Sequence, residues 1–222
     1  MKILTWNIER LKSAAKKGLI LQVLRSFDAD LVILTETHEA INLPGYYKAS
    51  TSLLPALHDG IKYKDGENRV TIWSKYPISE KLVTSDQHTS VCAEVETPLG
   101  VLRMYGTIIG VFGGKGHRFH NDLLAQLKDI RHLLTSENSC IVGDLNTTFT
   151  GYVYPSHAAR HALEVEFEEQ GLINLTASIP DNVDHIIITK KFIGDRVVDL
   201  NIFNEDKSLS DHIGICVEIK SG

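Results

Sequence analysis

Polar side chains recur at the ends of apolar, strand-like segments of this 222-residue chain. Each apolar segment is rich in Val, Ile or Leu, and each ends or begins with a carboxylate, an amide or an imidazole. If these segment ends converge, they form one acidic, hydrogen-bonding cleft at the edge of a sheet. The side chains are Asn7, Glu36, Asp144 with Asn146, Asp184 with His185, and Asp211 with His212.

Such a cleft suits phosphate chemistry. Mg²⁺ prefers oxygen ligands, takes one or two carboxylates and keeps waters for a phosphate, so Glu36 is a candidate ligand, with Asn7 holding it or adding an oxygen. Asp144 can accept a proton from an attacking water. His212, held by a carboxylate, can donate to a phosphoryl oxygen as negative charge develops.

Composition sets limits on these interpretations. The net charge of −5 argues against a surface built throughout to coat nucleic acid, although a local basic groove stays possible. Cys92, Cys140 and Cys216 each lie in an apolar segment, which predicts buried free thiols in a reducing compartment. The chain shows neither a signal-peptide pattern at its start nor a long apolar run, so we expect a cytoplasmic protein or one whose exported precursor is not shown.

Apolar patterning predicts nine strands and three helices. Val- and Ile-rich runs predict strands at 2–8, 29–37, 70–74, 90–97, 101–109, 139–146, 184–190, 195–203 and 212–219. Apolar residues at helical spacing predict helices at 14–27, 121–137 and 157–171. Because helices alternate with strand pairs, the simplest packing is two mixed sheets face to face with helices outside, in a single domain over 1–222.

Six segments in order resemble the endonuclease/exonuclease/phosphatase superfamily. They are TWNIE (5–9), ILTET (33–37), TIWSKYPI (71–78), IVGDLN (141–146), VDHIII (183–188) and SDH (210–212). Each motif is weak alone, and their order carries the evidence. The superfamily includes DNase I-like nucleases, abasic-site endonucleases, sphingomyelinases and inositol polyphosphate 5-phosphatases. The resemblance implies a four-layer α/β sandwich that hydrolyses phosphoesters with a divalent metal, Mg²⁺ or alternatively Mn²⁺.

The resemblance also implies a role for each matching residue on the catalytic side. Asp144 activates or orients the attacking water, and Asn146 beside it contacts the phosphate. His212 stabilises the phosphoryl group in the transition state, and Asp184 orients His212. Asp211 lies near the metal or the nucleophile.

On the metal side, the resemblance makes Glu36 the metal-binding carboxylate and Asn7 its support. Glu9 departs from the superfamily pattern, in which an Asp, Gly or Asn often follows the Asn by two positions. It is either a second metal contact or an outward surface charge.

A second departure concerns the strand at 101–109. Many superfamily members carry a His or Tyr there that contacts the phosphate, whereas this chain has Ile108. The following segment GVFGGKGHRFHND is Gly-rich and basic, so we expect either a mobile loop that replaces the missing contact or an ordinary exposed loop. Its candidate contacts are Lys115, His117, Arg118 and His120. Arg69, just before the strand at 70–74, is either a residue that reaches a phosphate or, as expected of a solitary basic residue, a solvated charge.

The substrate is left open among three possibilities. The leading interpretation is a nuclease, supported by the compact size and the basic segment, with nucleic acid as the partner. A phosphatase, or a phosphodiesterase acting on lipids or small molecules, is the second. A catalytically inactive binding module is the third, and the intact polar set argues against it.

Overall fold

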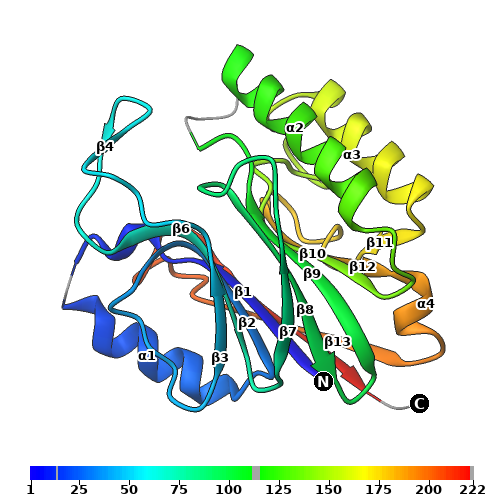
Figure 1. Cartoon of the computed structure of the whole chain (residues 1–222), viewed down its shortest axis with the longest axis horizontal. Coiled ribbons are helices and arrows are strands. Elements are labelled where there is room, and N and C mark those ends of the chain that lie inside the picture. Colours follow the sequence, from blue (N-terminus) through cyan, green and yellow to red (C-terminus); the bar gives the residue numbers. More distant parts are fainter. Residues whose placement is uncertain (14, 112–115, 221–222) are drawn as a thin grey trace.

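Two six-stranded sheets lie face to face at the centre of the protein (Figure 1). The computed structural model describes residues 1–13, 15–111 and 116–220. The first sheet has the strand order β13-β14-β1-β2-β6-β3, and the second has the order β11-β12-β10-β9-β8-β7. Within the described residues, one further antiparallel pair, β4 (Leu57–His58) with β5 (Ile61–Lys62), forms a small separate hairpin.

The two sheets are built on the same plan. The first contains β1 (Lys2–Asn7), β2 (Leu31–His38), β3 (Tyr47–Ser50), β6 (Glu67–Ser74), β13 (Val197–Phe203) and β14 (Gly214–Lys220). The second contains β7 (Ile78–Leu82), β8 (Ser90–Thr97), β9 (Gly100–Ile108), β10 (Ser139–Asp144), β11 (Leu172–Asn174) and β12 (Asp184–Thr189). Among the described strands, β1 pairs with β2 and β9 with β10 in parallel, and the other pairs are antiparallel. Both parallel pairs are joined through a helix, as a parallel crossover requires.

Helices cover the outer face of each sheet (Figure 1). α1 (Lys16–Phe27) buries Ile20 and Leu24 against the first sheet. α2 (His117–Leu133) and α3 (His157–Glu169) pack on the second sheet, and the short α4 (Lys190–Ile193) follows β12. A third apolar cluster, with side chains from both sheets, fills the space between them. The predicted four-layer α/β sandwich is therefore confirmed, whereas its boundary as a single domain stays a prediction.

The structure also corrects local expectations. β3, β7 and β11 were absent from the prediction; the burial pattern of β7, for example, leaves only its ends half-buried, so its sequence lacks an apolar run. α2 begins four residues earlier than predicted because Phe119 extends the buried stripe of Leu123 and Leu127 by one turn. Arg69 is 2% exposed and bonded to Asp59 and Tyr63, so its expected solvation was wrong.

The three thiols are buried and free, as predicted. Burial raises the pKa of Cys92 to about 12 and that of Cys216 to about 11. All three lie in or beside the packed clusters, so they fill core volume rather than offer a nucleophile.

Candidate active site

Strand register brings the predicted polar residues to one edge of the sandwich. In the first sheet, Asn7 at the end of β1 lies opposite Thr35 of β2, the residue before Glu36. In the second sheet, Asp144 at the end of β10 lies directly opposite Asp184 at the start of β12. Side chains that are far apart in the sequence therefore meet where the two sheets face each other.

Asn7 connects the carboxylates of the two sheets. It is fully buried, and its Nδ2 donates to Asp144 Oδ2 at 3.1 Å and to Glu36 Oε1 at 3.4 Å. Its Oδ1 accepts from the backbone N–H of Glu9 at 2.9 Å, which fixes the amide orientation. Asn7 thus holds two carboxylates at a fixed separation across the interface between the sheets.

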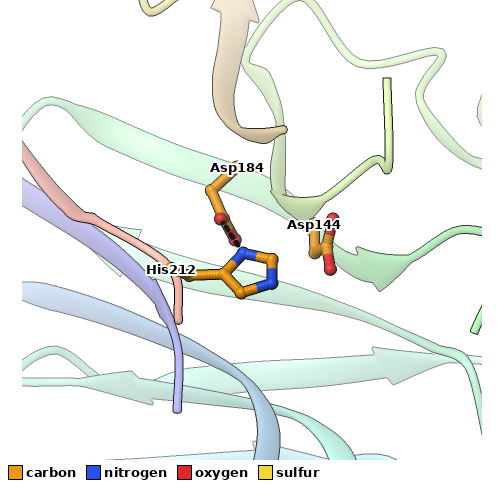
Figure 2. A group of neighbouring side chains, drawn as sticks. All are labelled: Asp144, Asp184 and His212. Atoms are coloured by element: carbon orange, nitrogen blue, oxygen red, sulfur yellow. Dashed lines mark hydrogen bonds and ion pairs between the residues drawn. The ribbon is translucent and has the colours of Figure 1, made fainter. Parts of the chain in front are cut away.

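Asp184 and His212 form a hydrogen-bonded pair, with Asp144 on the side of the ring away from the His212 backbone (Figure 2). The imidazole Nδ1 lies 2.6 Å from Asp184 Oδ2. Burial alone would lower the His212 pKa, but the charges of Asp184, Asp144 and Asp211 and the bond to Asp184 outweigh it and raise the pKa to about 10. The ring is therefore a cation at neutral pH, with Nε2–H available as a donor.

The loop that carries His212 is fixed to the first sheet by Ser210. The Ser210 hydroxyl donates to the backbone carbonyl of Asn7 at 2.6 Å and accepts from the N–H of His212 at 3.2 Å. Trp6 Nε1 and Asn204 Nδ2 both donate to the carbonyl of His212. The Ser210–Asn7 contact joins residues 203 positions apart, so no local signal in the sequence indicates it.

Asp144 is a buried carboxylate in a strained neighbourhood. Burial and the nearby Asp184 raise the pKa of Asp144 to about 7, although His212 and the backbone N–H of Asn146 act to lower it. Gly143 precedes it with φ of 139°, and a Cβ at Gly143 would lie 2.0 Å from the Thr107 carbonyl oxygen. Only glycine permits this close approach of β10 to β9, which sets where the Asp144 carboxylate points.

Asn146 lies two residues beyond Asp144 with a left-handed φ of 45°, a conformation that Asn tolerates. Its Nδ2 donates one hydrogen to the carbonyl of Ile109 at 2.8 Å. An amide nitrogen carries two hydrogens, so a second N–H remains for a phosphate oxygen.

Glu36 interrupts the regular pairing of β2 with β6. Its φ is 43°, which costs roughly 1–2 kcal/mol for a residue with a Cβ, and the register passes from Thr35 to Thr37 without pairing it. Burial raises its pKa, against the lowering effects of Asn7, His212 and Lys12. A strained, desolvated carboxylate is typical of a functional position.

The donor set at this edge fits a hard divalent cation. Burial destabilises the charged form of the Glu36 carboxylate and so raises its pKa. A cation beside the carboxylate would offset this cost of desolvation. Asn7 holds this carboxylate through its NH₂ group, and in this orientation its oxygen faces Glu9. These residues fit Mg²⁺ with Glu36 as ligand and Asn7 as support.

Glu9 belongs to the short turn η1 (Glu9–Leu11), whose three residues all have left-handed φ angles. Its carboxylate pairs with Lys12 at 2.7 Å. The backbone N–H of Glu9, rather than its side chain, is the group that contacts Asn7. A metal-binding role for Glu9 stays a prediction, and the geometry favours the surface-charge alternative.

Asp144, Asp184 and His212 also lie close enough together, with ligand atoms within 4.8 Å, to suggest a second position for a metal. His212 Nδ1 is bonded to Asp184, and the acidic neighbours raise the His212 pKa to about 10, which suits proton donation and charge stabilisation. A neutral ring held by Asp184 in the same way would present Nε2 as a metal ligand. Asp211 lies at its rim, 65% exposed, with Oδ1 3.9 Å from His212 Nε2.

The basic segment does not form the expected loop in its described part. His117, Arg118 and His120 lie in the first turn of α2, and Lys115 lies outside the described residues. Arg118 donates to the carbonyl of Asp59 in the hairpin, and His120 lines a hollow between α2 and α3. Their contact with phosphate stays a prediction. Ile108 is fully buried in the core, so this slot offers no polar contact.

Two cavities flank the polar residues. The His212-side cavity, about 710 Å³, is lined by His212, Asp184, Asn146 and residues of the 148–154 and 180–183 segments. The Glu36-side cavity, about 170 Å³, is lined by Glu36, Arg10, Lys12, Tyr63 and Arg69 among others.

The sequence matches the model of the endonuclease/exonuclease/phosphatase family over residues 4–212. The chain belongs to this family, whose members generally hydrolyse phosphoesters and typically depend on a divalent metal. No curated protein matches the chain.

Solved structures confirm the fold at low sequence identity. An AP endonuclease from Archaeoglobus fulgidus has a TM-score of 0.74 at 16% identity, with both chains fully covered. A 3'-5' exonuclease from Neisseria meningitidis has a TM-score of 0.73 at 16% identity, again with both chains fully covered. Beta toxin from Staphylococcus aureus has a TM-score of 0.66 at 18% identity, covering 99% of this chain and all of that one.

Within the described residues, no helix has both the length and the apolar character needed to cross a bilayer. The cytoplasmic location stays a prediction.

Proposed function

We propose that this protein is a divalent-metal-dependent phosphodiesterase that cleaves nucleic acid. The observation that carries the proposal is the side-by-side placement of two differently tuned groups. Asp144 has a pKa raised to about 7 by burial and Asp184, and His212 is held as a cation by Asp184. One group can accept a proton near neutral pH while the other stabilises negative charge.

In the proposed reaction, Asp144 takes a proton from the water whose oxygen bonds to phosphorus. The bond between phosphorus and the leaving oxygen breaks, and that oxygen takes a proton from solvent. His212 donates from Nε2 to a phosphoryl oxygen as its charge grows, and Asp184 keeps the ring in the required orientation. Asn146 offers its second N–H to the phosphate. Mg²⁺, or Mn²⁺, held by Glu36 with Asn7 in support, would supply neutralisation of the phosphate charge when bound.

Nucleic acid is the proposed substrate because one cavity is lined by His212 and another by Glu36, which leaves room for a substrate larger than a single phosphate. An AP endonuclease and a 3'-5' exonuclease share the fold, which supports this choice.

The test is Mg²⁺-dependent cleavage of labelled single-stranded, duplex and abasic DNA and of RNA, by wild type and by Asp144→Ala. We expect cleavage that disappears in the variant and without metal. If none of the polymers is cut, while a simple phosphodiester or phosphomonoester is hydrolysed through Asp144, the protein acts on a small-molecule or lipid phosphoester instead.

A further inference from the structure

One residue that lines the His212-side cavity has an unusually exposed aromatic side chain. Tyr152 lines this cavity and is 70% exposed, although a large aromatic ring normally loses free energy when it faces water. His212, Asp211 and Lys207 line the same cavity. The exposed ring therefore shares a cavity with the group proposed to act on the phosphate.

The backbone under this ring is fixed from both sides. The N–H of Tyr152 donates to Asp181 Oδ1 at 2.6 Å, and its carbonyl accepts from the Thr148 hydroxyl at 2.5 Å. The N–H of Asp181 donates back to Thr150 at 3.0 Å. Gly151 has φ of 82°, and a Cβ there would lie 2.3 Å from Asp181 Oδ1, so the two segments touch. The ring is thus presented from an anchored backbone.

The charges of the two cavities differ. The His212-side cavity is lined by the carboxylates of Asp181, Asp184 and Asp211, against which stand Lys207 and the His212 cation. With three carboxylates against two cations, the lining of this cavity does not favour the binding of several successive phosphates.

The Glu36-side cavity has three basic side chains, Arg10, Lys12 and Arg69, against Glu36 and Glu67. A cation bound at Glu36 would make it more positive still. A polyanionic backbone is therefore better accommodated on the Glu36 side, and an uncharged group on the His212 side.

We propose that Tyr152 is a stacking surface for an unpaired nucleobase next to the scissile phosphate. This inference rests on the proposed function and names its substrate class: single-stranded nucleic acid or a frayed end. A base within a duplex is already stacked on its neighbours and cannot cover the ring. Every base has a π-face, so the interaction tolerates sequence.

Binding measured without cleavage tests the proposal. Asp144→Asn protein, with Mg²⁺ present, is titrated by fluorescence anisotropy against labelled decathymidylate and against a decamer of tetrahydrofuran abasic units, which has the same charge but no bases. We expect roughly tenfold tighter binding of decathymidylate. Adding Tyr152→Ala should bring the ratio close to one, whereas Tyr152→Phe should preserve it. Tyr47→Ala, which removes another half-exposed ring on β3, should also preserve it.

The proposal is overturned if the starting protein does not distinguish the two decamers, or if Tyr152→Ala keeps the full ratio. Thermal melting of each variant shows that it is folded. The binding assay needs no turnover. Base stacking on Tyr152 can therefore be observed even if wild type cleaves no polymer, and cleavage can be observed even if the variants show no stacking. The two proposals therefore fail separately.

Discussion

His185 follows Asp184 of the Asp184–His212 pair, and its environment predicts how stability depends on pH. The ring is fully buried, with Nε2 2.9 Å from the carbonyl of Thr147 and Nδ1 2.9 Å from the Thr176 hydroxyl. Asn174 Nδ2 also faces Nδ1, at 3.3 Å. The Thr176 hydroxyl donates its hydrogen to Asn174 Oδ1 at 2.9 Å, so a neutral ring that donates from Nε2 to Thr147 leaves Nδ1 to accept from the Asn174 amide. A proton on Nδ1 would face the Asn174 donor.

Burial therefore lowers the His185 pKa from 6.5 to about 4, against the raising effects of Thr147, Asp184 and Asn182. The unfolded chain binds the proton more readily than the folded one between these values. Stability from this group is thus complete above about pH 6.5 and is lost as pH falls toward 4. The full loss is roughly 3 kcal/mol, of which about 1 kcal/mol falls between pH 7.5 and 5.5.

The perturbation is His185→Gln, which removes the titration but keeps an amide donor for the Thr147 carbonyl. Urea denaturation at pH 7.5 and 5.5 gives the free energy of unfolding of wild type and variant. Other groups titrate in both proteins, so their effects cancel in the comparison. We expect wild type to lose about 1 kcal/mol more than the variant over this interval.

His161→Gln is the matched control, because His161 is exposed on α3. It should reproduce the wild-type difference between the two pH values. If His185→Gln also reproduces it within about 0.5 kcal/mol, the imidazole is not held neutral in the fold and the reasoning is refuted.

Three further changes address the centre itself. Asp184→Asn removes the carboxylate that raises the His212 pKa to about 10, so the His212 pKa should fall toward 6.5. The rate of hydrolysis should then drop by about tenfold or more at pH 8 and partly recover at pH 6. An unchanged pH profile would contradict the role assigned to Asp184. Glu36→Gln should abolish the rise in melting temperature that Mg²⁺ produces in wild type, which a fluorescence melt measures; a retained rise would place the ion elsewhere. Gly143→Ala should destabilise by about 2–4 kcal/mol in urea, because its Cβ meets a β9 carbonyl. Gly100 also has a positive φ, but a Cβ there would not collide with a backbone carbonyl, so Gly100→Ala should lower the free energy of unfolding clearly less than Gly143→Ala. Equal losses of stability would show that the structure relieves the collision at Gly143.

Local patterning was sufficient for much of the fold. Runs of Val and Ile located nine strands, and the apolar stripe of α2 was found from Leu123 onward, since both depend on neighbours a few residues away. Short strands such as β7 and β11 were missed because their partners, rather than their own sequences, stabilise them. The same applies to the start of α2, where the packing of Phe119 decides the first turn.

The candidate site likewise has features that the sequence predicted and features that depend on the tertiary structure. The sequence alone determined which carboxylates, amides and imidazole follow each strand, and hence the class of chemistry. Only the tertiary structure decided that Asn7 reaches both Glu36 and Asp144, 29 and 137 residues away. The pKa values of Asp144 and His212, and the anchored ring of Tyr152, likewise come from burial and contacts between distant segments. Desolvation and hydrogen bonding act through space, and the order of residues along the chain does not specify these distances.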